Sequence, residues 1–477
     1  MQQQQQQINP VDVVAANAKD AEDAKADDDS QYSGPLFNDN IRSTTARTPE
    51  EERLAFKLPA GFEVQLYASE PDIGKPINIA FDAKGRMWVT QSFEYPFPAK
   101  APNRGKDRLT ILEDTDHDGK ADKFTHFTDT LNIPIGIYPM NDGAIAYSIP
   151  SVVRFTDANH DGIADGQKTL LTGFGHKDTH GMVNNFVRGY DGWLYADHGF
   201  TNSSTTSGSD GHSITMTSGN TFRFRLDGSR VEQTTFGRVN PFGLAYDERG
   251  YLYSTDCHSS PLYQLIMGGD YPSFGKTTRM GFAPDMKRLE NEATALAGLA
   301  YYSDVQFPIE YRNDFYMGDV VTSRIYRNSY INRGTTPIGK RETDFMKSKD
   351  PWFRPVDVKL GPDGALYIAD FYNSIIGHYE VPLDDPHRDK TRGRIWRITY
   401  KGQHNAIKDW SAATIDELLT ALDMQNISVR MTVMDQLSDR IGTKAIEPLK
   451  AVLNNKSTSS LKYIHSLWIL QRLNAGR

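Results

Sequence analysis

A short phrase recurs six times along the chain, and it constrains the fold more than any other feature. In each copy a few apolar residues precede Asp-Gly, Asn-Gly or a close variant, and an apolar-aromatic strand follows that often ends in Asp. The turn positions lie roughly 50 to 63 residues apart, at Gly85, Gly143, Gly192, Gly250, Asn313 and Gly364. Repeats of about 40 to 50 residues or more are typical of β-propeller blades. The sequence therefore predicts an all-β fold, a six-bladed β-propeller.

Each copy combines a tight turn with the alternation of a strand. In residues 361–370, GPDGALYIAD, the Asp-Gly turn precedes the alternating run 365–368, as in a hairpin. Matching outer strands are expected at 107–114, 151–157, 221–228, 323–329 and 393–400. Because helical periodicity is absent between these strands, residues 55–400 are predicted to form one propeller domain.

The two ends of the chain have a different character. Residues 1–50 open with glutamines and continue as a polar, acidic stretch, which predicts a disordered tail. After residue 403, apolar residues recur at spacings of three and four, which is typical of amphipathic helices. Four helices are expected within 411–425, 427–441, 445–455 and 460–474. They resemble two HEAT-type helical pairs, the beginning of a longer array within 403–477.

Charge and cysteine content exclude several function classes. The formal net charge is -8, the pI is near 5.9, and no Lys/Arg cluster is present, so a nucleic-acid-binding surface is not expected. The single cysteine, Cys257, excludes an intrachain disulfide, a CxxC zinc site and CxxCH haem attachment. No apolar run approaches the roughly 18 to 20 residues of a transmembrane segment, and no secretory signal is visible. Small molecules are the expected partners.

Two acidic loops repeat the front half of a calcium-binding loop. Their oxygen ligands occupy positions 1, 3, 5 and 9: Asp114, Asp116, Asp118 and Asp122 in one, and Asp157, Asn159, Asp161 and Asp165 in the other. Gly119 and Gly162 stand at position 6, whereas Thr125 and Lys168 replace the glutamate expected at position 12. The sequence predicts structural calcium in both loops. The alternative is a pair of solvated acidic turns.

Polar residues gather at the ends of the repeated strands. If the strands line a central channel, these residues converge on an axial pocket. At strand ends they are Gln91, Glu94, Asp197, His198, Asp256, His258, Asp319 and Asp370, and before strands they are His180, Asn184, Arg238, Asn240, Arg354 and Asp357. A single Asp at such a position can instead cap a loop or link two blades. Because His176, His180, His198 and His258 lie in polar, Gly-rich segments, at least one histidine is expected to be functional.

Two stretches carry a family resemblance. HGMVNNFVRGYDGWLYADHG (180–199) and GRVNPFGLAYDERGYLYSTD (237–256) resemble the glucose/sorbosone dehydrogenase superfamily of six-bladed soluble quinoproteins. AGLAYYSDVQFPIEYRNDFYMGD (297–319) and the FRPVD…GPDGALY…GRIWRIT series (353–399) most resemble the propeller of PVC-type membrane-bound dehydrogenase-like proteins. In that group HEAT-like repeats and a c-type haem module often follow the propeller.

The resemblance implies a sugar or polyol dehydrogenase that uses pyrroloquinoline quinone. It assigns His180 as the general base, which suits an imidazole, while the quinone supplies the redox chemistry. The residues expected to contact the cofactor are Asn184, Arg238, Asn240, His258 and Arg354, with Arg324 a further candidate cation. Val239 stands where the family has arginine, as does Asn184, and DCHSSP (256–261) lacks a recognisable cofactor-side calcium loop. A periplasmic or extracellular location and a separate electron acceptor, such as a cytochrome, are also implied.

Two other functions remain open at this stage. The propeller could be a non-catalytic module that binds a carbohydrate or a protein, with the helices as a docking surface. It could also be a hydrolase or lyase that uses a metal ion held by axial His and Asp residues. The geometry of the axial pocket discriminates among the three.

Overall fold

The six repeat turns all contain a residue with a positive φ angle. These angles lie between 60° at Asn313 and 141° at Gly143, a region that glycine enters freely and asparagine tolerates. Each turn reverses the chain between the first two strands of one antiparallel sheet. The structure, a computed structural model, describes residues 29–100, 104–257, 262–273, 295–333, 336–377, 380–403 and 405–475.

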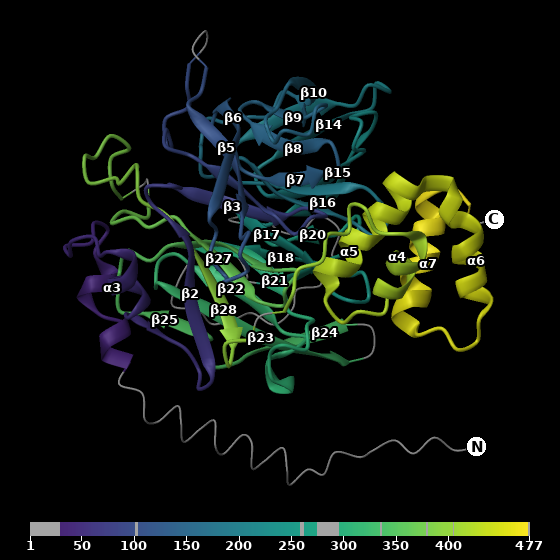
Figure 1. The fold of residues 1–477 in the computed structure, drawn as a ribbon. Helices are drawn as coiled ribbons and strands as arrows, with labels where there is room; N and C mark the ends of the chain where they lie inside the picture. Colours follow the sequence, from purple (N-terminus) through teal and green to yellow (C-terminus); the bar gives the residue numbers. More distant parts are fainter. Residues whose placement is uncertain are drawn as a thin grey trace.

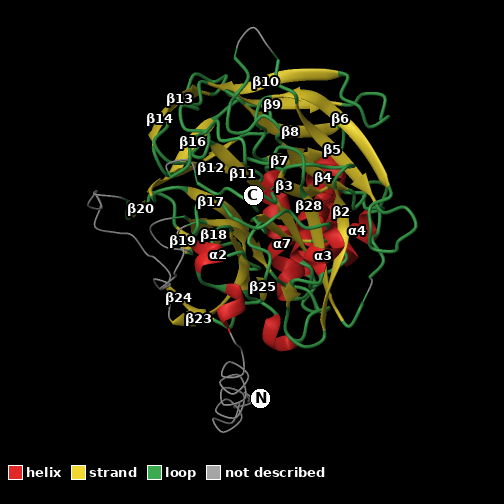
Figure 2. Cartoon of the chain, turned by 90° about the vertical axis from the view of Figure 1, so that its left-hand side faces the viewer, coloured by secondary structure: helices red, strands yellow, loops and turns green. Residues whose placement is uncertain are grey.

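Six sheets stand around an axis as blades (Figure 2), which confirms the predicted propeller. The first two blades are β3 (Pro76–Phe81), β4 (Met87–Gln91), β5 (Asp107–Glu113) and β6 (Lys123–Leu131), then β7 (Ile137–Met140), β8 (Gly143–Ser148), β9 (Ser151–Thr156) and β10 (Gly166–Thr172). The third is β11 (Val183–Arg188), β12 (Leu194–His198), β15 (Asn220–Phe224), β16 (Val231–Gly237) and β20 (Asp270–Tyr271). The fourth is β17 (Pro241–Tyr246), β18 (Leu252–Asp256) and β19 (Tyr263–Leu265).

The last two blades recruit strands from the start of the chain. The fifth is β21 (Leu296–Tyr301), β22 (Phe315–Asp319), β23 (Arg324–Arg333), β24 (Thr336–Arg341), β25 (Met346–Ser348) and β1 (Phe56–Lys57), with the short helix η2 (Ile309–Tyr311) between β21 and β22. The sixth is β26 (Pro355–Leu360), β27 (Leu366–Asp370), β28 (Arg394–Tyr400) and β2 (Phe62–Ser69). Because β2 pairs antiparallel with β28, the amino-terminal strand closes the ring. A separate hairpin consists of β13 (Ser203–Ser207) and β14 (Ser213–Thr217).

The core lies between neighbouring blades. Trp88 and Ile111 of the first blade pack with Ala144 and Phe155 of the second, for example. At the axis, the first strands of successive blades are neighbours, and they approach so closely that a Cβ on Gly298 of β21 would lie 2.6 Å from the Cα of Asp357. The innermost strand of each blade therefore comes before the repeat turn. The expectation that the Asp-ended strand lines the channel is wrong, since that strand is second in its blade.

The carboxyl-terminal segment is helical, as predicted, and its helices lie on one face of the propeller (Figure 1). They are α4 (Ile415–Ala421), α5 (Ile427–Asp435), α6 (Ile446–Asn454) and α7 (Ser460–Arg472), with η3 (Gln436–Ile441) and η4 (Gly442–Ala445) after α5. Arg188 on β11 forms ion pairs with Asp435 at 3.0 Å and Asp439 at 2.5 Å, and Arg472 of α7 donates to the Tyr190 carbonyl at 2.8 Å and the Gly189 carbonyl at 2.7 Å. These contacts fix the helices to the blades. Their HEAT-type pairing stays a prediction.

The amino-terminal segment lies on the opposite side of the blades (Figure 1). Residues 1–28 of the expected tail are outside the described residues, but 29–50 are not disordered as predicted. They include η1 (Asp29–Tyr32) and α2 (Pro35–Asn38) and lead into α3 (Pro49–Arg53). Phe37 is buried, so this polar segment has an apolar anchor that its composition hides. Within the described ranges, every helix is too short or too polar to cross a lipid bilayer.

Candidate active site at the propeller axis

A cavity of about 470 Å³ lies at the end of the axis where the inner strands begin. Its wall includes Ile77 of β3, Phe242 of β17, Leu296 of β21 and Val356 of β26. This size is typical of a small-molecule site. Aromatic rings also line it, from Phe37, Tyr95, Phe200, Phe242 and Phe371. The six blades therefore place side chains around one shared cavity.

His180 lines this cavity from the loop before β11. Its Nδ1 lies 3.3 Å from Oδ1 of Asp178, and the same carboxylate oxygen accepts the His180 backbone N–H at 2.9 Å. The ring of Tyr95 packs edge-on against the imidazole, with centroids 5.1 Å apart. Asp178 and Tyr95 thus hold the imidazole at the cavity wall, with Nδ1 toward the carboxylate.

Asn240 also lines the cavity, but its side chain braces the loops around it. Its Oδ1 accepts the Phe200 backbone N–H at 3.1 Å, and its Nδ2 donates to the His180 carbonyl at 3.2 Å. Asp256 accepts the Asn240 backbone N–H at 2.8 Å. Asn240 is therefore a positioning residue for His180.

Arg354 brings a buried cation to the cavity from the loop before β26. The residue is 2% exposed. Its Nη1 donates to Ser323 Oγ and the Phe353 carbonyl, both at 3.1 Å, whereas its Nε and Nη2 have no acceptor among the described residues. Burial is the main cause that lowers the pKa of Arg354 well below its usual range. A buried cation with unused donors is suited to an anionic group of a ligand.

Arg42 is a second cation of the cavity, and the sequence interpretation missed it. It is 3% exposed, and it donates from Nη1 to the Asp39 carbonyl at 2.6 Å and from Nη2 to the Val321 carbonyl at 2.8 Å. Burial lowers its pKa to about 10, while the Asp39 carboxylate acts in the opposite direction. No motif marks Arg42, since it lies in a segment whose composition predicts disorder.

Three other expected cofactor contacts lie elsewhere. Arg238 is fully buried in an ion pair with Asp197 at 3.3 Å and donates to Ser254 Oγ at 2.5 Å. The Nδ2 of Asn184 donates to the carbonyls of Met182 and Pro241, so its amide is also used within the protein. Neither residue lines the cavity. Arg324 pairs with Asp344 at 2.7 Å, and His258 lies outside the described residues.

The aspartates at the ends of the second strands organise loops. Asp256 accepts the backbone N–H groups of Val239 and Asn240, and Asp370 accepts that of Arg354. Asp319 accepts those of Val321 and Thr322. Burial raises the pKa of Asp319 and Asp370. Asp256 and Asp370 hold the loops that carry Asn240 and Arg354, and Asp319 holds the turn that follows its own strand. All three aspartates therefore cap loops, the alternative considered for such residues.

Cys257 lines the same cavity. Its Sγ contacts the Leu296 carbonyl at 3.6 Å, and burial is the main cause that raises the pKa of its thiol. The thiolate is the nucleophilic form of cysteine. Burial thus favours the neutral thiol at this position of the cavity wall.

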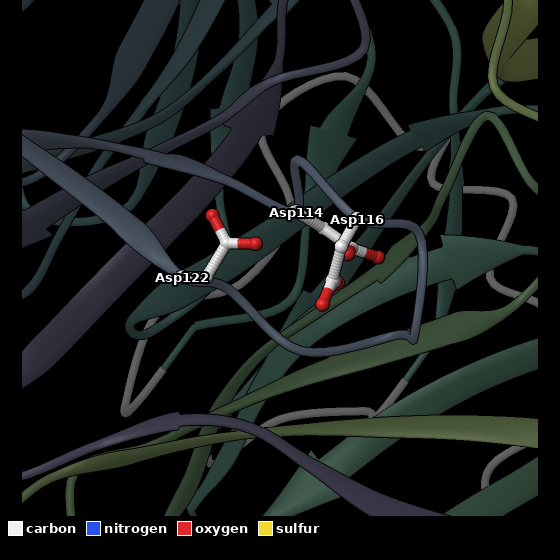
Figure 3. A group of neighbouring side chains, drawn as sticks. All are labelled: Asp114, Asp116 and Asp122. Atoms are coloured by element: carbon white, nitrogen blue, oxygen red, sulfur yellow. The ribbon is translucent and has the colours of Figure 1, made fainter.

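The two acidic loops have the same conformation, far from the axis. In the first, Asp114 accepts the backbone N–H groups of Asp118 and Gly119, and in the second Asp157 accepts those of Asp161 and Gly162. The carboxylates of Asp114, Asp116 and Asp122 can each offer an oxygen within 4.8 Å of the others (Figure 3). Burial raises the pKa of Asp114. Within the described ranges this is the one such group of metal-ligating side chains.

Each acidic loop also contacts the outer strand of the preceding blade. The Ala121 N–H of the first loop donates to the Tyr67 carbonyl on β2 at 2.9 Å. The Ala164 N–H of the second donates to the Phe127 carbonyl on β6 at 2.8 Å. The loops therefore connect neighbouring blades at the rim.

Comparison with known proteins places this site in a recurrent fold. A family model described as "Domain of unknown function (DUF7133)" matches residues 48–402. No curated protein matches the chain. A putative oxidoreductase (glucose dehydrogenase) of Thermus thermophilus superposes with a TM-score of 0.50 at 17% identity, covering 71% of this chain and 100% of its own. The PQQ-bound aldose sugar dehydrogenase of Streptomyces coelicolor gives a TM-score of 0.45 at 17% identity, covering 72% and 100%.

Proposed function

We propose that this chain, which belongs to the family described as a domain of unknown function (DUF7133), is a sugar or polyol dehydrogenase. The axial cavity would be its active site. One observation carries the proposal. His180, Asn240 and Arg354 come from loops of three different blades, and all three line one cavity. A proton acceptor and an anion-binding cation are thereby combined in a single small-molecule site.

The residues present fit pyrroloquinoline quinone, a flat cofactor with three carboxylates. Arg354 and Arg42 offer guanidinium N–H groups that no described residue accepts, and guanidinium pairs well with carboxylate. The aromatic side chains of Tyr95 and Phe371 line the same cavity and suit a flat ring system. When bound, the quinone would supply the two-electron oxidation that protein side chains cannot perform.

His180 would act as the general base. With Nδ1 beside Asp178, the Nε2 atom is the one that accepts the proton of the substrate hydroxyl. The Asp178 carboxylate fixes the ring orientation and stabilises the imidazolium that forms. Asn240 holds the carbonyl of His180, so it keeps the base in place without contacting the substrate. The electrons would then pass to a separate acceptor such as a cytochrome, in the periplasm or outside the cell.

The test compares two histidines of the same loop region. His180→Ala, reconstituted with pyrroloquinoline quinone and calcium, is expected to lose aldose-dependent dye reduction by at least about 100-fold, the usual contribution of a general base. His176 does not line the cavity, so His176→Ala is the matched control and should keep the activity. If the wild-type chain neither binds the quinone in calorimetry nor oxidises any sugar, the proposal is wrong.

A carbohydrate-binding propeller is the second candidate. The buried ion pair between Arg238 and Asp197 favours the carbohydrate-binding function, because Arg238 is then not available as a cation for a tricarboxylate in the cavity. Glycan binding that is unchanged in His180→Ala, together with no quinone binding, would select this function.

We further propose that both acidic loops bind calcium in a structural role. Closely spaced carboxylate oxygens are the ligands that calcium prefers, and a bound cation would offset the repulsion within each loop. Because each loop contacts the preceding blade, the ion would stabilise the outer rim rather than the cavity.

A further inference from the structure

The amino-terminal strap, residues 35–42, forms one wall of the axial cavity. Phe37, Asp39, Asn40 and Arg42 of the strap all line it, and α2 lies on the face of the blades that Figure 2 presents. The strap is held at its end, where the Arg42 N–H donates to the Ser374 carbonyl at 2.9 Å and Ile41 bridges to Ile375. The wall is thus contributed by a segment outside the six blades.

Docking of the strap brings two cations into the same cavity. Arg42 and Arg354 are 3% and 2% exposed, and the proximity of Arg42 is a further cause that lowers the pKa of Arg354 after burial itself. The Nε of Arg42 and the Nε and Nη2 of Arg354 have no acceptor within the described part of the chain. Buried cations are normally paired, yet none of these three N–H groups is hydrogen-bonded to an anion.

The nearest carboxylates do not fill that role by hydrogen bonding. Asp319, Asp350 and Asp370 act on Arg354 electrostatically, but none of them accepts a hydrogen bond from its guanidinium group, and Oδ2 of Asp319 has no donor among the described residues. Asp370 accepts the Arg354 backbone N–H, Asp350 accepts the Tyr372 hydroxyl at 2.8 Å, and Asp319 accepts the Val321 N–H. The Asp39 carboxylate acts to raise the pKa of Arg42. Because Asp39 is an exposed residue, it is not a buried partner for this cation.

We propose that a carboxylate of the ligand binds between Arg42 and Arg354, and that this binding and the docking of the strap stabilise each other. The inference rests on the proposed function for its location only. The anion offsets the repulsion between the two guanidinium groups, and by thermodynamic reciprocity whatever favours the docked strap also raises the affinity for the anion. The strap is therefore a part of the binding site that closes with the ligand.

The test uses the full chain and a probe without redox activity, benzene-1,3,5-tricarboxylate. Calorimetry gives its affinity, and hydrogen exchange followed by mass spectrometry gives the protection of residues 35–42. In the wild type the probe should slow exchange in the strap several-fold. Arg42→Gln and Arg354→Gln should each weaken binding about 10-fold and abolish that protection, since each removes one charged partner.

Two further variants separate this effect from misfolding. Arg53→Gln removes a partly exposed arginine of α3 that pairs with Glu50, and it should behave as the wild type. Arg42→Lys keeps the charge but not the two-pronged geometry, so it should fold like the wild type and bind with intermediate affinity.

Several outcomes would overturn the inference. The first two concern binding: the wild type does not bind the probe, or Arg42→Gln binds it with the same affinity as the wild type. The other two concern hydrogen exchange: residues 35–42 are equally protected with and without the probe, or inorganic phosphate protects them as well as the probe does. The last result would remove the preference for carboxylate. Because the probe supports no turnover, these results are independent of dehydrogenase activity. Quinone-dependent activity with full quinone affinity in Arg42→Gln would leave the proposed function standing and refute the strap's role.

Discussion

At the scale of single residues, burial controls the charge of a histidine in the carboxyl-terminal helices. His465 on α7 is fully buried, its Nδ1 lies 2.8 Å from the Leu461 carbonyl, and Tyr190 packs against its ring. Burial, with a further effect of Arg430, lowers the pKa of His465 to about 4. The folded protein therefore favours the neutral imidazole over the pH range in which an ordinary histidine becomes protonated.

This shift predicts a pH-dependent stability. Above the ordinary pKa of 6.5 His465 is neutral in both states, so it carries no penalty. As the pH falls from 6.5 toward 4, the unfolded chain gains the proton first, and the free energy of unfolding should drop by up to about 3 kcal/mol. Urea unfolding at several pH values measures the drop, and His465→Gln should reduce it. The exposed His387 provides the control His387→Gln, and an equal effect in that variant would contradict the assignment.

At the scale of elements, close contact between inner strands depends on a glycine. Gly298 of β21 has a φ of +70° and no room for a Cβ beside Asp357 of β26. Gly298→Ala should lower the free energy of unfolding by about 3 kcal/mol, from backbone strain and overpacking together. Gly211 also has a positive φ, +86°, but nothing lies within 4 Å of its Cβ position, so Gly211→Ala should cost about 1 kcal/mol. Equal losses in urea unfolding would exclude crowding at the axis as the cause.

The acidic loops give a second prediction at this scale. If calcium binds between strands of the same blade and stabilises contact with the preceding one, its addition to chelator-treated protein should raise the Tm by a few degrees. Asp114→Asn and Asp157→Asn should each diminish the increase, whereas Asp129→Asn, at an exposed position on β6, should not. Differential scanning calorimetry measures the Tm with and without calcium. If calcium leaves the Tm unchanged, the loops are solvated turns.

At the scale of the whole molecule, the helices and the propeller are joined by a partly buried charged contact. Arg188 is 7% exposed in its side chain and pairs with Asp435 and Asp439 across the junction. Arg188→Met should reduce the free energy of unfolding by about 2 kcal/mol, because it leaves two carboxylates with one partner fewer. Arg53→Met, in a surface pair with Glu50, should be nearly neutral. A loss no larger than that of Arg53→Met would mean that apolar packing alone holds the helices.

The sequence predicts the ring better than it predicts the site. Repeated turns and alternating strands are local patterns, so six blades and four carboxyl-terminal helices follow from them directly. Which cations reach the cavity depends on long-range geometry. Gly237 and Arg238 both have left-handed backbone conformations, and the Arg238 side chain forms a buried ion pair with Asp197. Arg42 lies in a segment with few apolar residues. Neither outcome has a signature in residue spacing.

The pairing of β2 with β28 has a consequence for how the chain is made. The strand that completes the last blade is synthesised before the first blade, while its partner β28 is synthesised only after every other blade. Until then β2 is an unpaired edge, and such edges are prone to join other chains. The nascent chain therefore exposes this edge while the other blades are being made, and co-translational protection of β2 by a chaperone would matter more than protection of any later blade strand.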